Sequence, residues 1–224
     1  MIRRSSYLVA ALWLGLIGGT SFGQESPFFE KRTVLAPEGK AACVGLPIIT
    51  VTKNNVVIVI GSERMGNRSD MGNVQNSLIS RSVDRGKIWS KPVRLSGTPK
   101  GVVSDLVTGR TFLFLGQNQA LTNKDGKRIH ENWLIKNPPE VWQNINQFVS
   151  DDDGKNWQKV QDLAPLLQKK KHTHLPLPSI STGFQLKFGL HKGRLILPTR
   201  IWTKNKWDFN YSHNTIIYSD DHGK

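Results

Sequence analysis

The pattern of apolar and polar residues along this chain indicates short β-strands separated by turns. Val, Ile, Leu, Phe and Thr, which are enriched in strands, dominate segments of about five or six residues. Turn residues such as Asn54-Asn55 and His191-Lys192-Gly193 separate these segments, and no useful length of sequence has helical periodicity. The sequence therefore predicts an all-β protein, with strands over residues 46–51, 56–60, 77–82, 111–115, 146–150, 183–187, 194–199 and 215–219.

Three segments share the pattern S-x-D-x-G-x-x-W. They begin at Ser82, Ser150 and Ser219, which are 68 and 69 residues apart, and the third reaches Lys224 before its Trp position. In such a segment the Asp side chain can accept hydrogen bonds from backbone N–H groups, the Gly supplies a positive φ, and the Trp packs on the next strand. The segments are predicted to be hairpin turns, and the alternative is that their aspartates act as ligands or catalysts.

The even spacing of these turns predicts the architecture. Several short strands that recur as a unit about every 68 residues are typical of propeller blades, which commonly have four strands each. We therefore predict a β-propeller of which about three blades are present, with a β-sandwich as the alternative architecture.

The first 23 residues have the features of a secretory signal peptide. They contain no acid, Arg3 and Arg4 precede an apolar run from Tyr7 to Ile17, and a small-x-small triplet ends at Gly23. The apolar run is shorter than the ~20 residues that a membrane span needs. We expect cleavage after residue 23, a partial propeller over residues 24–224, a secreted or periplasmic location, and no membrane anchor in the mature chain.

The chain carries 31 basic and 17 acidic residues, a formal net charge of +14. A field of this sign favours acidic partners such as polyanionic glycans, whereas the alternative is that the surplus Lys residues only keep an exported protein soluble. The run of lysines at residues 169–171 has no interleaved aromatic residues, so nucleic acid is not an expected partner. The single cysteine, Cys43, excludes an intramolecular disulfide.

The sequence predicts neither a metal site nor a cofactor site. His172 and His174 have a spacing that two ligands on one side of a strand could use, but no Cys or acidic residue is near them in sequence. No glycine-rich phosphate loop, G-x-S-x-G elbow or H-E-x-x-H motif occurs.

The three repeats resemble the Asp-box, and with the segments around them the chain is similar to the sialidase (neuraminidase) family of six-bladed propellers. The run from Gly45-Leu46-Pro47 through Gly61-Ser62-Glu63-Arg64 to Ser69-Asp70 is similar to the first blade of that family, where an R-I-P motif precedes an E-x-R segment and a loop with an Asp. Residues 182–186 and 192–198 look like the G-I-x-L and G-R-L-x-x-P strands of the third blade.

The resemblance implies an exo-α-sialidase, a retaining glycoside hydrolase that removes terminal sialic acid from glycoconjugates. In this family three arginines bind the sugar carboxylate, an Asp is the general acid/base and a Tyr is the nucleophile. Asp70 matches the acid/base, and Arg64 matches the E-x-R arginine that lines the sugar pocket. A planar guanidinium suits this role because it binds a carboxylate through two parallel hydrogen bonds.

The chain departs from the family pattern at two places in the first blade. Gly45 stands where the R-I-P arginine is expected, and Ser62 occupies the acidic position of E-x-R unless a shift of one residue lets Glu63 serve. The chain also has room for only about three of six blades, so we expect it to be an N-terminal portion that is catalytically incomplete alone. The alternatives are a non-catalytic Asp-box propeller that binds glycans or proteins, and a glycosidase with a different substrate.

Overall fold

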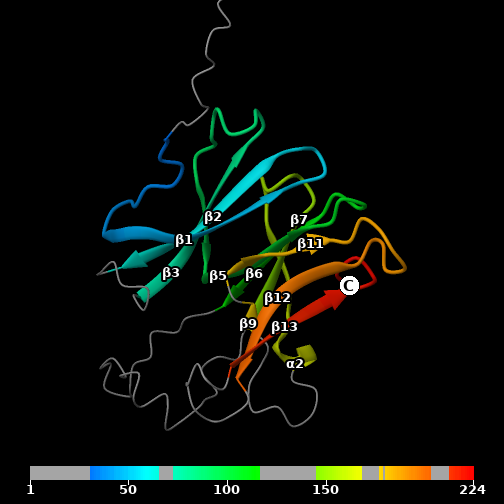
Figure 1. Ribbon diagram of the computed structural model, residues 1–224. Coiled ribbons are helices and arrows are strands. Elements are labelled where there is room, and N and C mark those ends of the chain that lie inside the picture. The colour runs from blue at the N-terminus through cyan, green and yellow to red at the C-terminus, as the bar shows by residue number, and fades with distance from the viewer. Residues whose placement is uncertain (1–30, 66–72, 117–144, 168–176, 179, 203–211) are drawn as a thin grey trace, which may run out of the picture. The chain divides into compact units, whose positions relative to one another are not determined.

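The computed structural model describes residues 31–65, 73–116, 145–167, 177–178, 180–202 and 212–224. The chain divides into two units, residues 1–32 and 33–224, and the second contains all the strands described below. Residues 1–23, the predicted signal peptide, lie outside the described residues. Figure 1 shows that the described residues of the second unit form β-sheets, together with the short helix α2 at Ala164–Leu167.

The described residues form three sheets, and the strands of each are close in sequence except that β10 of the second sheet follows β9 of the third. The first has the order β1-β2-β3-β4, and its neighbouring strands are antiparallel. The second has the order β10-β5-β6-β7-β8, in which β10 pairs in parallel with β5. The third has the order β11-β12-β13, with β9 also paired to β12.

The bounds of the first sheet are Ala41–Val51, Val57–Met65, Asn73–Ser82 and Val93–Ser96 for β1 to β4. Those of the second are Thr98–Ser104, Thr111–Gly116, Ile145–Ser150, Gln158–Asp162 and Ser181–Thr182 for β5 to β8 and β10. Those of the third are Leu177–Pro178, Phe184–Gln185, Leu195–Trp202 and Ser212–Ser219 for β9, β11, β12 and β13.

The hydrophobic core is divided between the two junctions of these sheets. Because side chains of a strand alternate between its faces, the second sheet can contact both of its neighbours. Val102 therefore packs toward the first sheet and Val103 toward the third. The first cluster comprises Ile48, Val56, Ile58, Ile60, Ile79, Val102, Leu113 and Leu115, and the second comprises Val103, Phe112, Phe114, Ile145, Leu195 and Leu197.

The S-x-D-x-G segments form the predicted turns. In the first, Asp84 accepts hydrogen bonds from the backbone N of Ile88 and from Ser82 Oγ, both at 2.8 Å, and Gly86 has a φ of +89°. The indole Nε1 of Trp89 donates to Gly86 O at 2.9 Å. The second turn repeats each of these contacts, and the third repeats the contacts of its Ser, Asp and Gly. The side chains of Asp84 and its counterparts are therefore engaged in holding the turns.

The residue before the glycine of each later turn also reaches back to the preceding sheet. Asp153 of the second turn accepts hydrogen bonds from Thr52 Oγ1 at 2.6 Å and from Asn54 Nδ2 at 3.0 Å, both in the hairpin between β1 and β2. Its backbone oxygen accepts a further bond from Arg81 Nε at 2.9 Å. This turn therefore joins the first sheet to the second.

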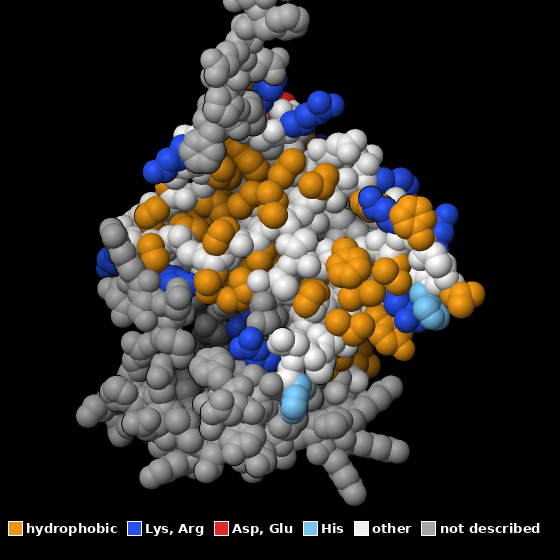
Figure 2. Space-filling model, viewed as in Figure 1, with side chains coloured by type: hydrophobic (Ala, Val, Ile, Leu, Met, Phe, Trp, Pro, Cys, Tyr) orange, Lys and Arg blue, Asp and Glu red, His pale blue; other side chains and the backbone are white. Residues whose placement is uncertain are grey.

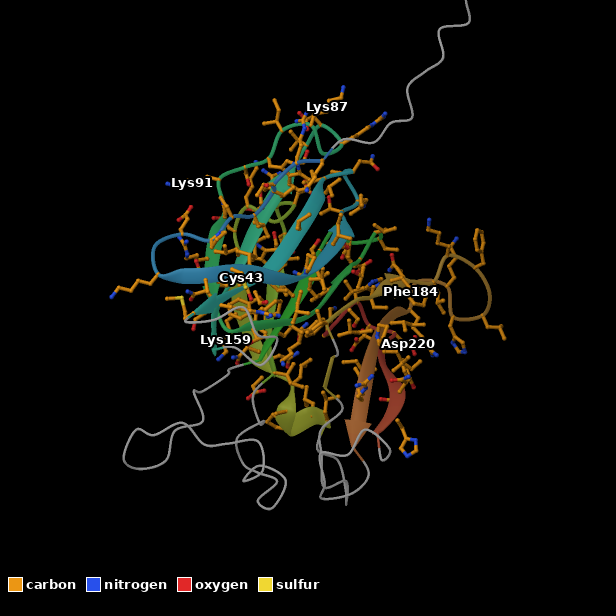
Figure 3. All side chains as sticks on the ribbon, turned by 60° about the vertical axis from the view of Figure 1, so that its left-hand side comes forward. Cys43, Lys87, Lys91, Lys159, Phe184 and Asp220 are labelled. Carbon is orange, nitrogen blue, oxygen red and sulfur yellow. The ribbon has the colours of Figure 1, made fainter. Side chains whose placement is uncertain are left out.

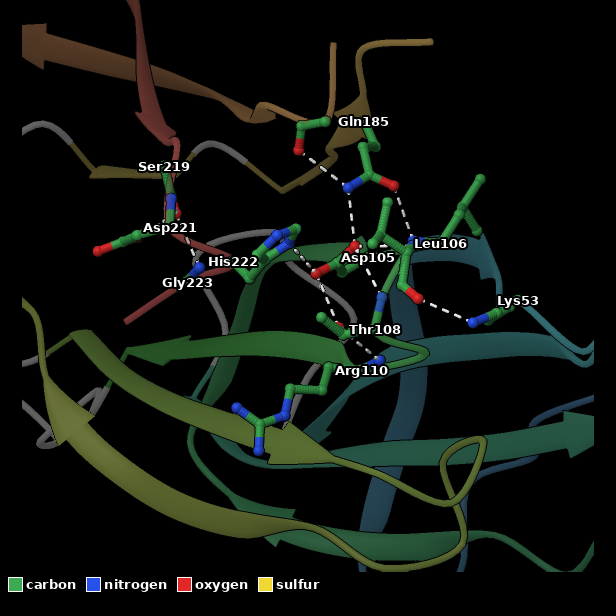
Figure 4. A network of polar contacts seen from close by, with 12 residues as sticks. Lys53, Asp105, Leu106, Thr108, Arg110, Gln185, Ser219, Asp221, His222 and Gly223 are labelled. Carbon is green, nitrogen blue, oxygen red and sulfur yellow. Dashed lines mark hydrogen bonds and ion pairs between the residues drawn. The ribbon is translucent and has the colours of Figure 1, made fainter. Parts of the chain in front are cut away.

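The third turn makes the equivalent contact with different chemistry. His222 Nδ1 lies 2.8 Å from Oδ2 of Asp105, which is at the hairpin between β5 and β6 and is fully buried (Figure 4). Asp105 also accepts hydrogen bonds from Gln185 Nε2 at 2.7 Å and from Thr108 Oγ1 at 2.7 Å. Gln147 Nε2 donates to Gly223 O at 3.2 Å. A polar network centred on Asp105 therefore joins the second sheet to the third.

Candidate functional site

The candidate site lies at the end of the sheets opposite the S-x-D-x-G turns. Strand β1 starts at this end, and β2 finishes there, since Cys43 pairs with Arg64 and Met65 with Asn73. Figure 3 labels Cys43 on β1 at this end, and Lys87 in the first of the turns at the other end of the first sheet. The sequence-predicted residues Arg64 and Gly45 are thus brought together on neighbouring strands.

Asp70 lies outside the described residues, in segment 66–72. The structure describes the two residues that flank this segment, Met65 and Asn73, and these are paired across β2 and β3. The role expected for Asp70 therefore stays a prediction.

Arg64 is a buried arginine, with 2% of its surface exposed. Its guanidinium lies against the main chain of Gly45, because a β-carbon built on Gly45 would be only 2.9 Å from Arg64 Cζ and 3.0 Å from Nη2. On β1 and β2, Cys43 pairs with Arg64, and Gly45 pairs with Ser62. Because these positions are two residues apart on each strand, they lie on one face of the sheet. The position at which the family resemblance expects an arginine is therefore next to the guanidinium of Arg64.

The backbone at Gly45 has an irregular form. Ser62 Oγ donates a hydrogen bond to Gly45 O at 2.8 Å, and the β1–β2 register shifts between Gly45 and Ile48. Leu46, inside this bulge, has a φ of +50°, a left-handed conformation that is uncommon for residues other than glycine. Ser62 is therefore engaged with the backbone of β1.

Glu63 points elsewhere and makes an ion pair within the first sheet. Its carboxylate lies 3.0 Å from Arg94 Nη2 and accepts a hydrogen bond from Asn76 Nδ2 at 2.8 Å, while Arg94 also pairs with Glu38 at 2.8 Å. The hydrogen bond from Arg94 is the main reason why the pKa of Glu63 lies below its ordinary value, against the opposing effect of burial. Among the contacts described, Glu63 pairs with β3 and β4, on the other face of β2 from Arg64.

Sequence reasoning did not single out Lys100, which lies on β5 in a register shift between Pro99 and Gly101. Its side chain runs over Gly116, where a β-carbon would be 2.7 Å from Lys100 Cε. Burial lowers the pKa of Lys100 to about 8, because desolvation disfavours the charged ammonium. Thr50 near the end of β1 and Ser104 at the end of β5 are joined by a hydrogen bond of 2.9 Å, and Lys100 lies toward the start of β5. A lysine between Pro and Gly gives no signal of burial in the sequence.

Among the described residues, no group of three or more His, Cys, Asp or Glu side chains could hold a metal ion. In the same part of the chain, no helix has the length and apolar character that crossing a membrane requires.

Comparison with known proteins shows which solved structures share the fold of this chain. No protein-family model matches the chain. Among solved structures, it is similar to a Hadza microbial sialidase with 18% identity and a TM-score of 0.60, over 81% of this chain and 36% of that one. It is also similar to a leech intramolecular trans-sialidase with 14% identity and a TM-score of 0.61, over 87% of this chain and 45% of that one. The intramolecular trans-sialidase of Ruminococcus gnavus has 16% identity and a TM-score of 0.56, over 82% and 59%.

The fold is a partial β-propeller of the sialidase type. This confirms the predicted all-β fold class, with three sheets in place of the two that a sandwich would have. At 14 to 18% identity the likeness shows the fold alone, and this chain spans 36 to 59% of the length of these sialidases. Activity, substrate and partners are therefore matters for a proposal.

Proposed function

We propose that this chain belongs to an exo-α-sialidase-like glycoside hydrolase that acts on terminal sialic acids of glycoconjugates. The observation that carries the proposal is the buried Arg64 beside the start of β1, on a scaffold similar to three solved sialidases. A buried guanidinium at a strand end suits a planar anion such as a sugar carboxylate, which it can bind through two parallel hydrogen bonds. The net charge of +14 favours the approach of such anionic glycans.

In this proposal Arg64 binds the sugar carboxylate and Asp70 is the general acid/base. Because only 2% of Arg64 is exposed, a carboxylate reaches its guanidinium only after the groups that cover it move aside. Asp70 would protonate the leaving oxygen and later take a proton from water, which contributes about 10² to 10⁴-fold to a rate. The reaction needs no metal or organic cofactor. We place the protein outside the cytoplasm, secreted or periplasmic, on the basis of its signal-like first 23 residues.

We expect this chain by itself to bind a sialoside without appreciable turnover. Nothing in its 224 residues matches the tyrosine nucleophile or the remaining arginines of the family. General acid help alone is far smaller than the acceleration that glycosidases achieve, which is at least about 10⁶-fold.

The experiment compares binding and turnover in the same preparation. Binding of the methyl α-glycoside of sialic acid to the purified chain is measured by calorimetry, and turnover is measured on a fluorogenic sialoside. Asp70→Asn is the test variant, and Asp84→Asn, in a turn at the opposite end, is the matched control. Binding of the sialoside by the chain and by the control variant is the expected result. Absence of any sialoside binding by the folded chain contradicts the proposal.

A second candidate function is a non-catalytic propeller that binds glycans or proteins. The observation that favours it is that Gly45 stands where the resemblance expects the first carboxylate-binding arginine, and that the Arg64 side chain lies against it. The same experiment separates the two functions when the chain is assayed together with the remaining propeller of a sialidase-like protein. Turnover that Asp70→Asn removes supports the hydrolase, whereas binding with no turnover in any combination supports the binding protein.

A further inference from the structure

Gly45 and Arg64 compete for one region of space. A β-carbon on Gly45 would lie 2.9 Å from Cζ, 3.0 Å from Nη2 and 3.1 Å from Nε of Arg64. Carbon and nitrogen atoms that are not bonded prefer separations of about 3.5 to 4.0 Å, so even a methyl group at residue 45 would push the guanidinium away. An arginine at residue 45 and Arg64 in its present position are therefore mutually exclusive.

The main chain of Gly45 has little freedom to move aside. Its carbonyl oxygen accepts a hydrogen bond from Ser62 Oγ at 2.8 Å, and Ser62 itself is fully buried. On the other side, Leu46 holds the left-handed φ of +50° at the bulge, which fixes the direction in which β1 leaves residue 45. Crowding at residue 45 would therefore be relieved mainly by movement of the Arg64 side chain.

We propose that Gly45 is a positioning residue, whose missing side chain lets Arg64 of β2 present the carboxylate-binding group that an arginine on β1 would otherwise present. The proposal rests on the proposed function, since it assumes that a sugar carboxylate is the ligand. It accounts for two features at this end of the chain, the glycine at residue 45, where the family resemblance expects an arginine, and the burial of the arginine at residue 64. The ligand class is a compact carboxylate on a pyranose, held by a single guanidinium.

The contact itself can be tested without any ligand, by a double-mutant cycle on thermal unfolding. Gly45→Ala is expected to lower the melting temperature in the wild-type background, because the new methyl group displaces a buried guanidinium. In the Arg64→Ala background the same substitution is expected to be neutral or stabilising, because the methyl group then has room. Equal effects of Gly45→Ala in both backgrounds would overturn the proposed contact. Should Arg64→Ala fail to fold, Arg64→Met provides the second background, with an uncharged side chain that can move.

The role in recognition is tested with two probes that differ only in the carboxylate. The full chain is titrated with the methyl α-glycoside of sialic acid and with the methyl ester of the same compound, which is uncharged. A charge-assisted contact with one guanidinium predicts a preference of about 10 to 100-fold for the acid. Gly45→Ala and Arg64→Lys are expected to reduce this preference, and Arg64→Ala to abolish it.

The decisive variant moves the arginine back to β1. Gly45→Arg alone is expected to lose the preference for the acid, because two guanidinium groups crowd one region. The double variant Gly45→Arg with Arg64→Ala is expected to regain at least part of it, since the introduced arginine starts where the guanidinium of Arg64 now lies. A role of Arg64 in stability alone predicts no regain of preference in the double variant.

The outcomes separate this inference from the proposed function. A wild-type chain that prefers the acid, together with a Gly45→Ala variant that keeps the full preference, overturns the inference and leaves the proposed function standing. A folded wild-type chain that binds neither probe refutes the proposed function, and the inference that rests on it falls as well. Loss of preference in Gly45→Ala and regain in the double variant support both.

Discussion

Replacement of Asp105 by Asn is expected to loosen the third sheet from the second. Asp105 Oδ2 accepts a hydrogen bond from Thr108 Oγ1 at 2.7 Å and lies 2.8 Å from His222 Nδ1. The substitution keeps the size of the side chain but puts an amide group, which donates, in the place of this oxygen. Hydrogen bonds to charged groups contribute about 1.5 to 3 kcal/mol each, and the Thr hydroxyl can turn to accept, so a net loss of about 2 to 4 kcal/mol is expected. For a chain of this size that corresponds to a fall of roughly 4 to 16 °C in melting temperature.

The pH dependence of this effect follows from the state of Asp105. Burial by itself would raise the pKa of Asp105, but the hydrogen bonds from Thr108, Val107 and Gln185 together outweigh it and hold the pKa below its ordinary value. A carboxyl whose pKa is lowered by folding adds stability at pH values above its unfolded pKa, and that stability is lost as the pH falls through the folded pKa. The difference between wild type and Asp105→Asn is therefore largest near neutral pH and shrinks below about pH 4.

The assay is thermal unfolding between pH 3 and pH 8, followed by circular dichroism. The matched control is Asp151→Asn, which removes an ion pair with Arg110 at 2.9 Å whose partners are 65% and 43% exposed. Exposed pairs contribute about 0 to 1 kcal/mol, so this variant should unfold close to wild type. Equal melting temperatures for Asp105→Asn and Asp151→Asn across the pH range would refute the conclusion that the hydrogen bonds of Asp105 hold the third sheet to the second.

Three further predictions concern other parts of the chain. Asp84→Ala and Asp152→Ala should each lower the free energy of unfolding by about 1 to 2 kcal/mol, because they remove turn hydrogen bonds. Sialoside binding per folded molecule should stay unchanged, and loss of binding at unchanged stability would show that the turns have another role. Exported protein should begin close to Gln24 in N-terminal sequencing, and soluble cytoplasmic protein with an intact first residue would contradict export. The purified chain should self-associate in light scattering, because hydrophobic side chains gather in patches on the side shown in Figure 2. Ile216 and Tyr218 on β13 are also exposed, at 56% and 59%, and their replacement by Lys should reduce the association.

The fold was largely predictable because its repeat unit carries its own turn chemistry. The S-x-D-x-G segments located three turns, and apolar alternation located strands such as β6 and β7 to within a residue. Strand β5 was missed, although it forms both junctions, because Pro99 and Gly101 within it are residues that commonly mark turns. Its pairing depends on a bulge and on packing from both sides, and these are tertiary properties that local pattern does not contain.

The candidate site was less predictable than the fold. The sequence placed Arg64 and Gly45 in one motif, but their contact depends on the register of β1 against β2. It also left open whether Glu63 belongs to the site, and its ion pair with Arg94 is formed between strands 31 residues apart. The burial of Lys100 has no local signal either, since it depends on a bulge and on the absence of a side chain at Gly116.

The contacts of Asp153 and His222 differ in charge, and this difference distinguishes the two junctions between the sheets. Asp153 meets a hydroxyl and an amide in the first sheet, whereas His222 meets the carboxylate of Asp105 in the second. If the second sheet of one molecule packed against the second sheet of another, Asp153 would face Asp105 in the place of His222, and the two carboxylates would repel each other. Packing of a sheet against the wrong neighbour is therefore disfavoured by charge, even though the three repeats have the same turn and similar apolar strands.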